Sequence, residues 1–182
     1  MMKFSPLKIP DVILIVPDVH RDERGFFFET YQEEKFVKNG VTSLFVQDNH
    51  SKSMKGVLRG LHFQREPHAQ AKLIRVIRGE IFDVVVDIRK NSPSFGRHAS
   101  AYLSEENRNM LYVPKGFAHG YCVLQDHTEV LYKVSSLYAP KYEAGLLWKD
   151  PKLGIPWPKL DIPYALNARD EKYPLLEELK LD

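Results

Sequence analysis

Cysteine, long hydrophobic runs and an excess of either charge are all scarce in this sequence of 182 residues. Its one cysteine, Cys122, cannot form an intrachain disulfide, which excludes a disulfide scaffold. The segment Met1–His20 lacks the apolar length of a signal sequence or a membrane span, so we expect a soluble cytoplasmic protein with no membrane partner. Lysine and arginine total 26 against 24 for aspartate and glutamate, and no basic run stands out, which argues against nucleic-acid binding.

Short β-rich runs, separated by polar residues, glycine or proline, dominate the chain. Their number and brevity predict an all-β sandwich or barrel, and the length favours a single domain over residues 1–182. The predicted strands are Val12–Val16, Phe26–Tyr31, Ser43–Asn49, Val57–Gln64, Lys72–Arg78, Ile81–Ile88, Ala99–Leu103, Met110–Val113, His119–Leu124 and Glu129–Ser135.

One predicted strand, Ile81–Ile88, is mostly apolar, as expected for a central strand covered on both faces. The turn-like residues Arg78-Gly79-Glu80 precede it, so we expect a hairpin with the strand Lys72–Arg78.

Helices are few in the predicted fold. We expect helices at Gln32–Asn39, which Gly40 ends, and at Lys172–Leu179, with a short helical turn at Ser104–Asn107. Prolines accumulate from Pro151 to Pro163 and predict an irregular connection, after which the tail packs back on the barrel.

The densest polar cluster within a predicted strand is Arg59-Gly60-Leu61-His62-Phe63-Gln64. Strand alternation places Gly60, His62 and Gln64 on one face, while Leu61 and Phe63 point the other way. If the first face lines the barrel interior, His62 lies in a partly desolvated pocket suited to proton transfer. A structural histidine with a satisfied hydrogen bond explains the local sequence equally well.

A second segment, Val113–Gly120, contains Pro-x-Gly-x-x-His and resembles the second motif of the cupin superfamily. That resemblance implies a double-stranded β-helix, or jelly-roll barrel, with a few short peripheral helices. Metal-binding cupins supply His-x-His and a glutamate from their first motif, whereas the corresponding residues here are His62-Phe63-Gln64. His62 and His119 then lack a carboxylate at the cupin spacing, so we expect no metal site and no cofactor.

Two other residues have a structural and a functional interpretation. Tyr132 shares a strand face with Val130 and Val134, which is typical of a core tyrosine but also suits a proton donor aimed into the barrel. Lys72 opens a strand after a polar loop and by its position is a surface side chain, although a lysine in a pocket would stabilise an oxyanion.

The order of motifs along nearly the whole chain resembles the dTDP-4-dehydrorhamnose 3,5-epimerase family, metal-independent cupin enzymes of dTDP-L-rhamnose biosynthesis. Each motif alone is moderately specific, and their combination is strong. The matching stretches are residues 22–29, 47–51, 57–64, Lys72, residues 113–119, Tyr132-Lys133, residues 138–143 and residues 148–151.

The resemblance implies epimerisation at C3 and C5 of a dTDP-4-keto-6-deoxy sugar. By family position His62 is the base that removes a proton next to the C4 ketone, and Asp170 supports its imidazolium. Tyr132 returns a proton from the opposite face, and Lys72 stabilises the enolate, which replaces the surface prediction for this lysine. The alternative for Asp170 is a solvated carboxylate in a turn.

Substrate contacts follow from the same resemblance. Arg24 and Arg59 suit the diphosphate, because guanidinium groups bind phosphate oxygens in pairs. Tyr138 and one phenylalanine of Phe26–Phe28 are candidates to stack on thymine. The full set of matching contact positions is Arg24, Glu29, Gln47, Asn49, Arg59, His119, Tyr138, Glu143 and Arg169, the last of which replaces the family's usual lysine.

The family also implies a homodimer that exchanges N-terminal strands. Three alternatives stay open: a 3- or 5-monoepimerase of another dTDP-deoxysugar pathway, a non-catalytic nucleotide-sugar-binding cupin and a metal-dependent cupin oxygenase. The presence of a base, an acid and a cation together weighs against a mere binder.

Overall fold

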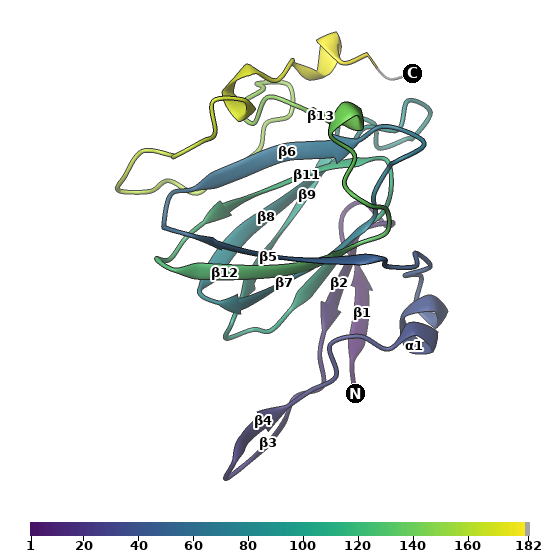
Figure 1. The fold of residues 1–182 in the computed structure, drawn as a ribbon, viewed down its shortest axis with the longest axis vertical. Helices are drawn as coiled ribbons and strands as arrows, with labels where there is room; N and C mark the ends of the chain where they lie inside the picture. Colours follow the sequence, from purple (N-terminus) through teal and green to yellow (C-terminus); the bar gives the residue numbers. More distant parts are fainter. Residues whose placement is uncertain (181–182) are drawn as a thin grey trace.

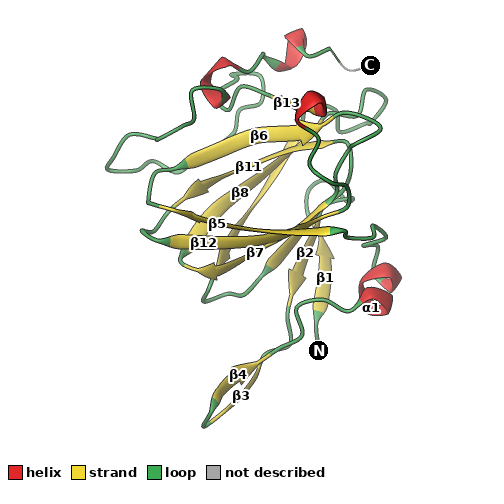
Figure 2. Cartoon of the chain, viewed as in Figure 1, coloured by secondary structure: helices red, strands yellow, loops and turns green. Residues whose placement is uncertain are grey.

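The computed structural model describes residues 1–180, and strands make up most of its regular structure (Figure 2). In chain order the strands are β1 (Lys3–Pro6), β2 (Ile13–Val16), β3 (His20–Asp22), β4 (Gly25–Phe27), β5 (Gln47–Ser53), β6 (Leu58–Gln64), β7 (Lys72–Arg78), β8 (Glu80–Asp87), β9 (His98–Ser104), β10 (Met110–Val113), β11 (Phe117–Val123), β12 (Thr128–Val134) and β13 (Glu143–Gly145).

These strands form two antiparallel sheets that face each other, and the predicted all-β jelly roll is confirmed (Figure 1). The larger sheet has six strands in the order β1-β2-β10-β7-β12-β5, and the smaller has five in the order β13-β6-β11-β8-β9. Strands β3 and β4 pair only with each other, in a hairpin that projects from the body of the molecule.

The predicted strand bounds hold for β7 and β10 and move by one or two residues for most of the others. Two strands differ by more: β4 ends at Phe27, where Phe26–Tyr31 was expected, and β5 was expected at Ser43–Asn49. Pairing with β12 begins at Gln47, and the apolar side chains of Leu44 and Val46 before it are exposed. The pattern of the sequence missed β1, β3 and β13, which are short strands.

The predicted hairpin between Lys72–Arg78 and Ile81–Ile88 is wrong. Strand β7 pairs with β10 and β12 in the larger sheet, whereas β8 pairs with β11 and β9 in the smaller one. The turn at Gly79 therefore carries the chain from one sheet to the other. Gly79 has a φ of +77°, and a Cβ atom there would lie 2.3 Å from Thr128 Oγ1, so this crossing requires glycine.

Strand β8 is buried on both faces, as predicted. Ile81 and Val85 belong to the core between the sheets, and Val84 and Val86 belong to a cluster on the outer face of the smaller sheet. The predicted return of the tail is also confirmed, because the C-terminal segment covers that outer cluster with Trp157, Leu160, Tyr164, Leu176 and Leu179.

The helix α1 (Glu33–Lys38) lies where Gln32–Asn39 predicted it, capped by the Gln32 side chain, and buries Phe36 against the outer face of the larger sheet. The predicted helix Lys172–Leu179 is wrong, because Pro174 interrupts it and leaves two 3₁₀ turns, η2 (Asp170–Lys172) and η3 (Leu176–Glu178). A third, η1, spans Pro140–Tyr142.

The predicted helical turn at Ser104–Asn107 is a turn over residues 105–107 that follows β9, and Arg108 N donates to Ser104 O across it at 2.9 Å. Within residues 1–180, no helix combines the length and the apolar character that crossing a bilayer requires.

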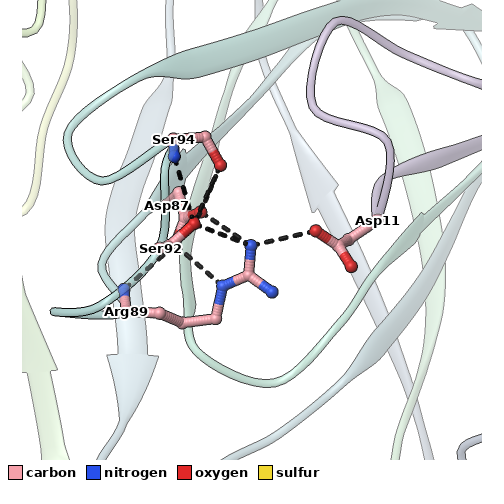
Figure 3. A network of polar contacts seen from close by, with 5 residues as sticks. All are labelled: Asp11, Asp87, Arg89, Ser92 and Ser94. Atoms are coloured by element: carbon pink, nitrogen blue, oxygen red, sulfur yellow. Dashed lines mark hydrogen bonds and ion pairs between the residues drawn. The ribbon is translucent and has the colours of Figure 1, made fainter.

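A network of polar contacts fastens the end of β8, where it pairs with the start of β11 (Figure 3). The buried Asp87 carboxylate accepts hydrogen bonds from Arg89 Nη2 at 2.7 Å, Ser92 Oγ at 2.5 Å and Ser94 Oγ at 2.6 Å. Arg89 also reaches Asp11, which ties β8 to the β1–β2 loop. Burial acts to raise the pKa of Asp87, but these hydrogen bonds outweigh it and lower the pKa to about 2.

Replacing Asp87 with asparagine is expected to lower the free energy of unfolding by roughly 2 kcal/mol at pH 7. That magnitude follows from the lowering of the Asp87 pKa from 3.8 to about 2. A carboxylate whose pKa is lowered by folding contributes its full stability above the pKa of the unfolded chain and loses it as pH falls through the pKa of the folded protein. The difference in the free energy of unfolding between Asp87→Asn and wild type therefore narrows as pH falls from 3.8 toward about 2. Urea unfolding across this pH range measures both effects.

The matched control is Asp11→Asn, which removes the half-exposed carboxylate from the same guanidinium. It should cost less than about 1 kcal/mol, since exposed ion pairs contribute little. Equal stability of Asp87→Asn and wild type at pH 7 would contradict the prediction.

Candidate active site

An irregularity in β6 decides which side chains the site contains. His62 pairs with His119 of β11 and Arg59 pairs with Tyr121, so β6 uses three residue steps where β11 uses two. The extra residue falls beside Gly60, where a Cβ atom would lie 2.7 Å from the Cα of Gly120. The bulge therefore places Arg59 on the same face as His62, whereas plain alternation would have placed it with Leu61.

The imidazole of His62 is bonded to a buried carboxylate. His62 Nε2 lies 2.9 Å from Asp170 Oδ1, and the second oxygen of Asp170 accepts a hydrogen bond from Gly60 N at 3.1 Å. An ionised carboxylate can only accept, so Nε2 is the donor in this hydrogen bond. The predicted proximity of His62 and Asp170 is thus observed.

Asp170 is not the solvated turn carboxylate of the alternative interpretation, because only 2% of its surface is exposed. Burial acts to raise its pKa, but the hydrogen bonds from His62 and Gly60 and the charges of His62 and Arg169 outweigh it and lower the pKa. The carboxylate therefore stays ionised beside the imidazole.

Lys72, at the start of β7, lines the same cavity as His62, contrary to the surface position that its local sequence suggests. Burial lowers the pKa of its ammonium to about 8, and the negative charges of Asp83 and Glu143 oppose that effect. Lys72 is therefore mainly charged at pH 7 and can stabilise a negative oxygen.

Tyr132, in the middle of β12, both packs against the interior core and reaches the cavity. Burial raises the pKa of its phenol, which the charge of Arg59 opposes. The hydroxyl consequently keeps its proton near neutral pH and is available as an acid.

The cavity between the sheets has a volume of about 240 Å³ and gathers seven of the residues that the sequence singled out. Its walls are Gln47, Asn49, His62, Phe63, Gln64, Gln70, Lys72, Tyr132, Tyr138 and Glu143. A second cavity of about 340 Å³ shares the His62 wall and is also lined by Arg59, Arg169 and Asp170. The imidazole of His62 therefore lines both cavities.

Glu143 joins three segments at the edge of the first cavity. Its Oε2 accepts hydrogen bonds from the Tyr138 hydroxyl at 2.8 Å and from Arg169 Nη1 at 2.6 Å. Arg169, which replaces the usual lysine of the resembled family, is therefore bound to a residue of its own chain.

His119 lies in β11 next to His62 but is buried and does not line either cavity. Its Nε2 lies 2.9 Å from the buried Asp83 carboxylate. Burial lowers the pKa of His119, and the Asp83 charge opposes that shift. Asp83 was not singled out from the sequence, although a carboxylate within the apolar run Ile81–Ile88, like Asp87 in the same run, signals a buried polar partner.

Two further predicted contact residues lie outside both cavities, as His119 does. Arg24 stands in the turn of the projecting β3–β4 hairpin and bonds to Asp22 (Figure 1). Glu29 pairs with Lys35 of α1. Phe27 on the same hairpin is 73% exposed, whereas the centroid of the neighbouring Phe26 ring lies 4.4 Å from the guanidinium carbon of Arg108.

The described residues contain no group of three or more His, Cys, Asp or Glu side chains placed to hold a metal ion.

Comparisons with known proteins all point to one family. A family model described as dTDP-4-dehydrorhamnose 3,5-epimerase matches residues 6–178. The dTDP-4-dehydrorhamnose 3,5-epimerase of Salmonella typhimurium is 50% identical over 182 residues, which is 100% of this chain and 99% of that protein.

Two solved structures extend the comparison. The Legionella pneumophila dTDP-6-deoxy-D-glucose-3,5-epimerase in complex with dTDP-4-keto-L-rhamnose has a TM-score of 0.95 at 41% identity and covers 99% of this chain and 95% of its own. A 3'-monoepimerase from Streptomyces bikiniensis in complex with dTDP-quinovose has a TM-score of 0.89 at 36% identity, covering 95% of this chain and 87% of its own.

Proposed function

The chain belongs to the dTDP-4-dehydrorhamnose 3,5-epimerase family, and on that premise we propose which of its residues carry out the reaction. It is an isomerase that inverts C3 and C5 of dTDP-4-dehydro-6-deoxy-D-glucose to give dTDP-4-dehydro-L-rhamnose, in dTDP-L-rhamnose biosynthesis. One observation supports the residue assignment above all: His62, which is hydrogen-bonded to Asp170, lines the same cavity as Lys72 and Tyr132.

His62 is the general base. The C4 ketone of the substrate acidifies the hydrogens on C3 and C5, and the free Nδ1 of His62 accepts one of them. The electron pair of the broken C–H bond moves to the C4 oxygen as an enolate. Asp170, which stays ionised and bonded to Nε2, stabilises the imidazolium that results.

Lys72 and Tyr132 complete the inversion. The Lys72 ammonium stabilises the enolate oxygen, because a fixed cation in a partly dry cavity interacts strongly with developing charge. Tyr132 then donates its proton to the carbon from the face opposite His62, which inverts the centre. Proton exchange with solvent restores the phenol and the imidazole before the second carbon reacts.

The remaining polar residues bind the nucleotide sugar. Arg59, held by hydrogen bonds to Ser53 Oγ at 3.0 and 3.3 Å, presents its guanidinium to the diphosphate. His119 lines neither cavity, so it contributes to substrate binding indirectly, through its position beside His62 in the sheet. Contacts to the sugar and nucleotide come from Gln47, Asn49, Tyr138, Glu143 and Arg169.

The functional unit is a homodimer in which N-terminal strands are exchanged and Arg24 and Glu29 contribute to the partner's site. The β3–β4 hairpin, which projects from the body of the molecule and carries the exposed Phe27, supports this arrangement, since neither Arg24 nor Glu29 lines the cavities beside His62 in its own chain. Light scattering of the purified protein measures its mass in solution, and the mass of a monomer would contradict the proposed homodimer.

Metal independence and a cytoplasmic location complete the proposal, and metal analysis and cell fractionation test them.

Isotope exchange tests the proposed function directly. Incubation with dTDP-4-keto-6-deoxyglucose in deuterated water is expected to place deuterium at both C3 and C5 of the product, read by mass spectrometry and NMR. Label at one carbon alone would identify a monoepimerase, as in the Streptomyces bikiniensis relative. An unlabelled, unchanged sugar would leave only a nucleotide-sugar binder and refute the assignment.

A further inference from the structure

Tyr173 lies beside the imidazole of His62, and the mechanism above gives it no role. The two ring centroids are 5.7 Å apart and the ring planes meet at 74°, an edge-to-face arrangement that aromatic rings prefer. Tyr173 follows η2, the turn that begins with Asp170. The same short segment therefore brings both a carboxylate and an aromatic ring to His62.

The surrounding backbone makes a defined place for this ring. Gly145 is the cross-strand partner of His62 in β13, and a Cβ atom there would lie 2.4 Å from Tyr173 Cε2. The chain is held on both sides of Tyr173, because Asp170 N donates to Asn167 O at 2.8 Å and Leu147 N donates to Pro174 O at 2.9 Å. The ring is thus fixed against His62 from behind.

The hydroxyl of Tyr173 does not hold the side chain in place beside His62. Its oxygen is buried and has no hydrogen-bond partner within residues 1–180. Burial raises the pKa of Tyr173 to about 12, so the phenol stays neutral. An unpaired buried hydroxyl opposes folding, which leaves the ring as the part of this side chain that contributes.

A neighbouring ring can restrain a histidine base because rotation about its χ2 torsion is otherwise weakly restricted. The χ2 angle of histidine has a broad, roughly two-fold distribution. One hydrogen bond to Asp170 fixes the position of Nε2, but the imidazole can still tilt about that bond. A quarter of the His62 side chain is exposed, so the opposite side of the ring gives less restraint.

We infer that Tyr173 is a positioning residue, whose ring fixes the plane of His62 so that Nε2 meets Asp170 while Nδ1 faces the cavity. The inference rests on the proposed function, in which Nδ1 takes the proton. It explains why a tyrosine with an unpaired hydroxyl lies next to the dyad: the flat aromatic surface, and not the polar atom, is what the base requires.

The variants Tyr173→Leu and Tyr173→Phe separate the ring from the hydroxyl. Tyr173→Leu is expected to lower kcat about 10- to 100-fold with less than about a three-fold change in KM, since small misplacement of a reacting group costs up to roughly that factor. Tyr173→Phe keeps the ring and should retain kcat within about two-fold. Tyr173→Leu at wild-type kcat, or Tyr173→Phe as slow as Tyr173→Leu, would overturn the inference.

A spectroscopic measurement distinguishes positioning from a general loss of packing. In ¹⁵N-histidine spectra the Nε2–H proton of His62, protected by Asp170, is expected in wild type and Tyr173→Phe and lost to exchange in Tyr173→Leu. Its persistence in Tyr173→Leu would refute the inference. If Tyr173→Leu fails to fold, Tyr173→Met, whose flexible side chain fills space without a flat ring, takes its place.

This spectrum is recorded without substrate. A wild-type protein that incorporates no deuterium would refute the proposed function, while the spectrum still decides whether Tyr173 orients His62. A labelled product from wild type together with unaltered Tyr173→Leu would refute only the role of Tyr173.

Discussion

Replacing His62 with alanine is expected to abolish epimerisation, with kcat/KM falling at least about 1,000-fold, while the fold and the affinity for dTDP stay close to wild type. A positioned general base contributes roughly 100- to 10,000-fold, and nothing else in the cavity has a free lone pair next to a buried carboxylate. Deuterium incorporation should disappear with turnover, because the C–H bond is no longer broken. The assay follows product formation by NMR.

His50→Ala is the matched control for this variant. His50 is a half-exposed imidazole in β5 that bonds to Glu129, so it resembles His62 in its acidic partner but lies outside both cavities. Its loss should change kcat/KM by less than about two-fold. Near-normal turnover in His62→Ala would show that another group removes the proton.

Replacing Tyr132 with phenylalanine is expected to separate proton exchange from inversion. His62 can still remove a proton and return a deuteron to the same face, but the acid on the opposite face is gone. Substrate recovered from deuterated water should therefore carry label with its configuration unchanged, while epimerised product falls at least about 100-fold. NMR reads both the position of the label and the configuration.

Tyr102→Phe is the control, because Tyr102 lies on β9 with about half of its surface exposed and outside both cavities. Unchanged product formation in Tyr132→Phe would assign the acid to another residue. Loss of both exchange and product would instead show that Tyr132 is needed to bind or orient the substrate before His62 acts.

Local sequence pattern predicted the elements that depend on local forces. Strands β7 and β10 lie at their predicted bounds because their branched and aromatic side chains favour extended structure and are followed by turn residues. The alternation also holds from Leu61 to Gln64, since Leu61 and Phe63 pack in the cluster on the outer face of the smaller sheet while His62 and Gln64 line the cavity between the sheets. Periodicity was sufficient there because the strand is regular from His62 onward.

Features that depend on distant partners could not be predicted locally. The turn at Gly79 suits a hairpin and a crossing between sheets equally well, and the choice depends on β10 and β11, which come later in the chain. The position of Arg59 likewise depends on a bulge that closes only against Gly120. Its assignment to the site came from family resemblance, because strict alternation would have pointed it away.

Other residues of the predicted site are either distant from His62 along the chain or line neither cavity. Asp170 and Tyr173 reach His62 through a segment without regular strands, and no local signal marks Tyr173 in the sequence. Arg24 and Glu29 bind Asp22 and Lys35 and line neither cavity beside His62, so the structure of one chain does not place them in the site.

The bond between His62 and Asp170 joins residues 108 positions apart. During translation the strand that carries the base leaves the ribosome long before the segment that carries its carboxylate. A growing chain can therefore build most of the two sheets while its histidine still lacks Asp170. In the proposed mechanism the base requires Asp170, so a chain that ends before this residue can resemble the full-length protein in its sheets and yet be inactive.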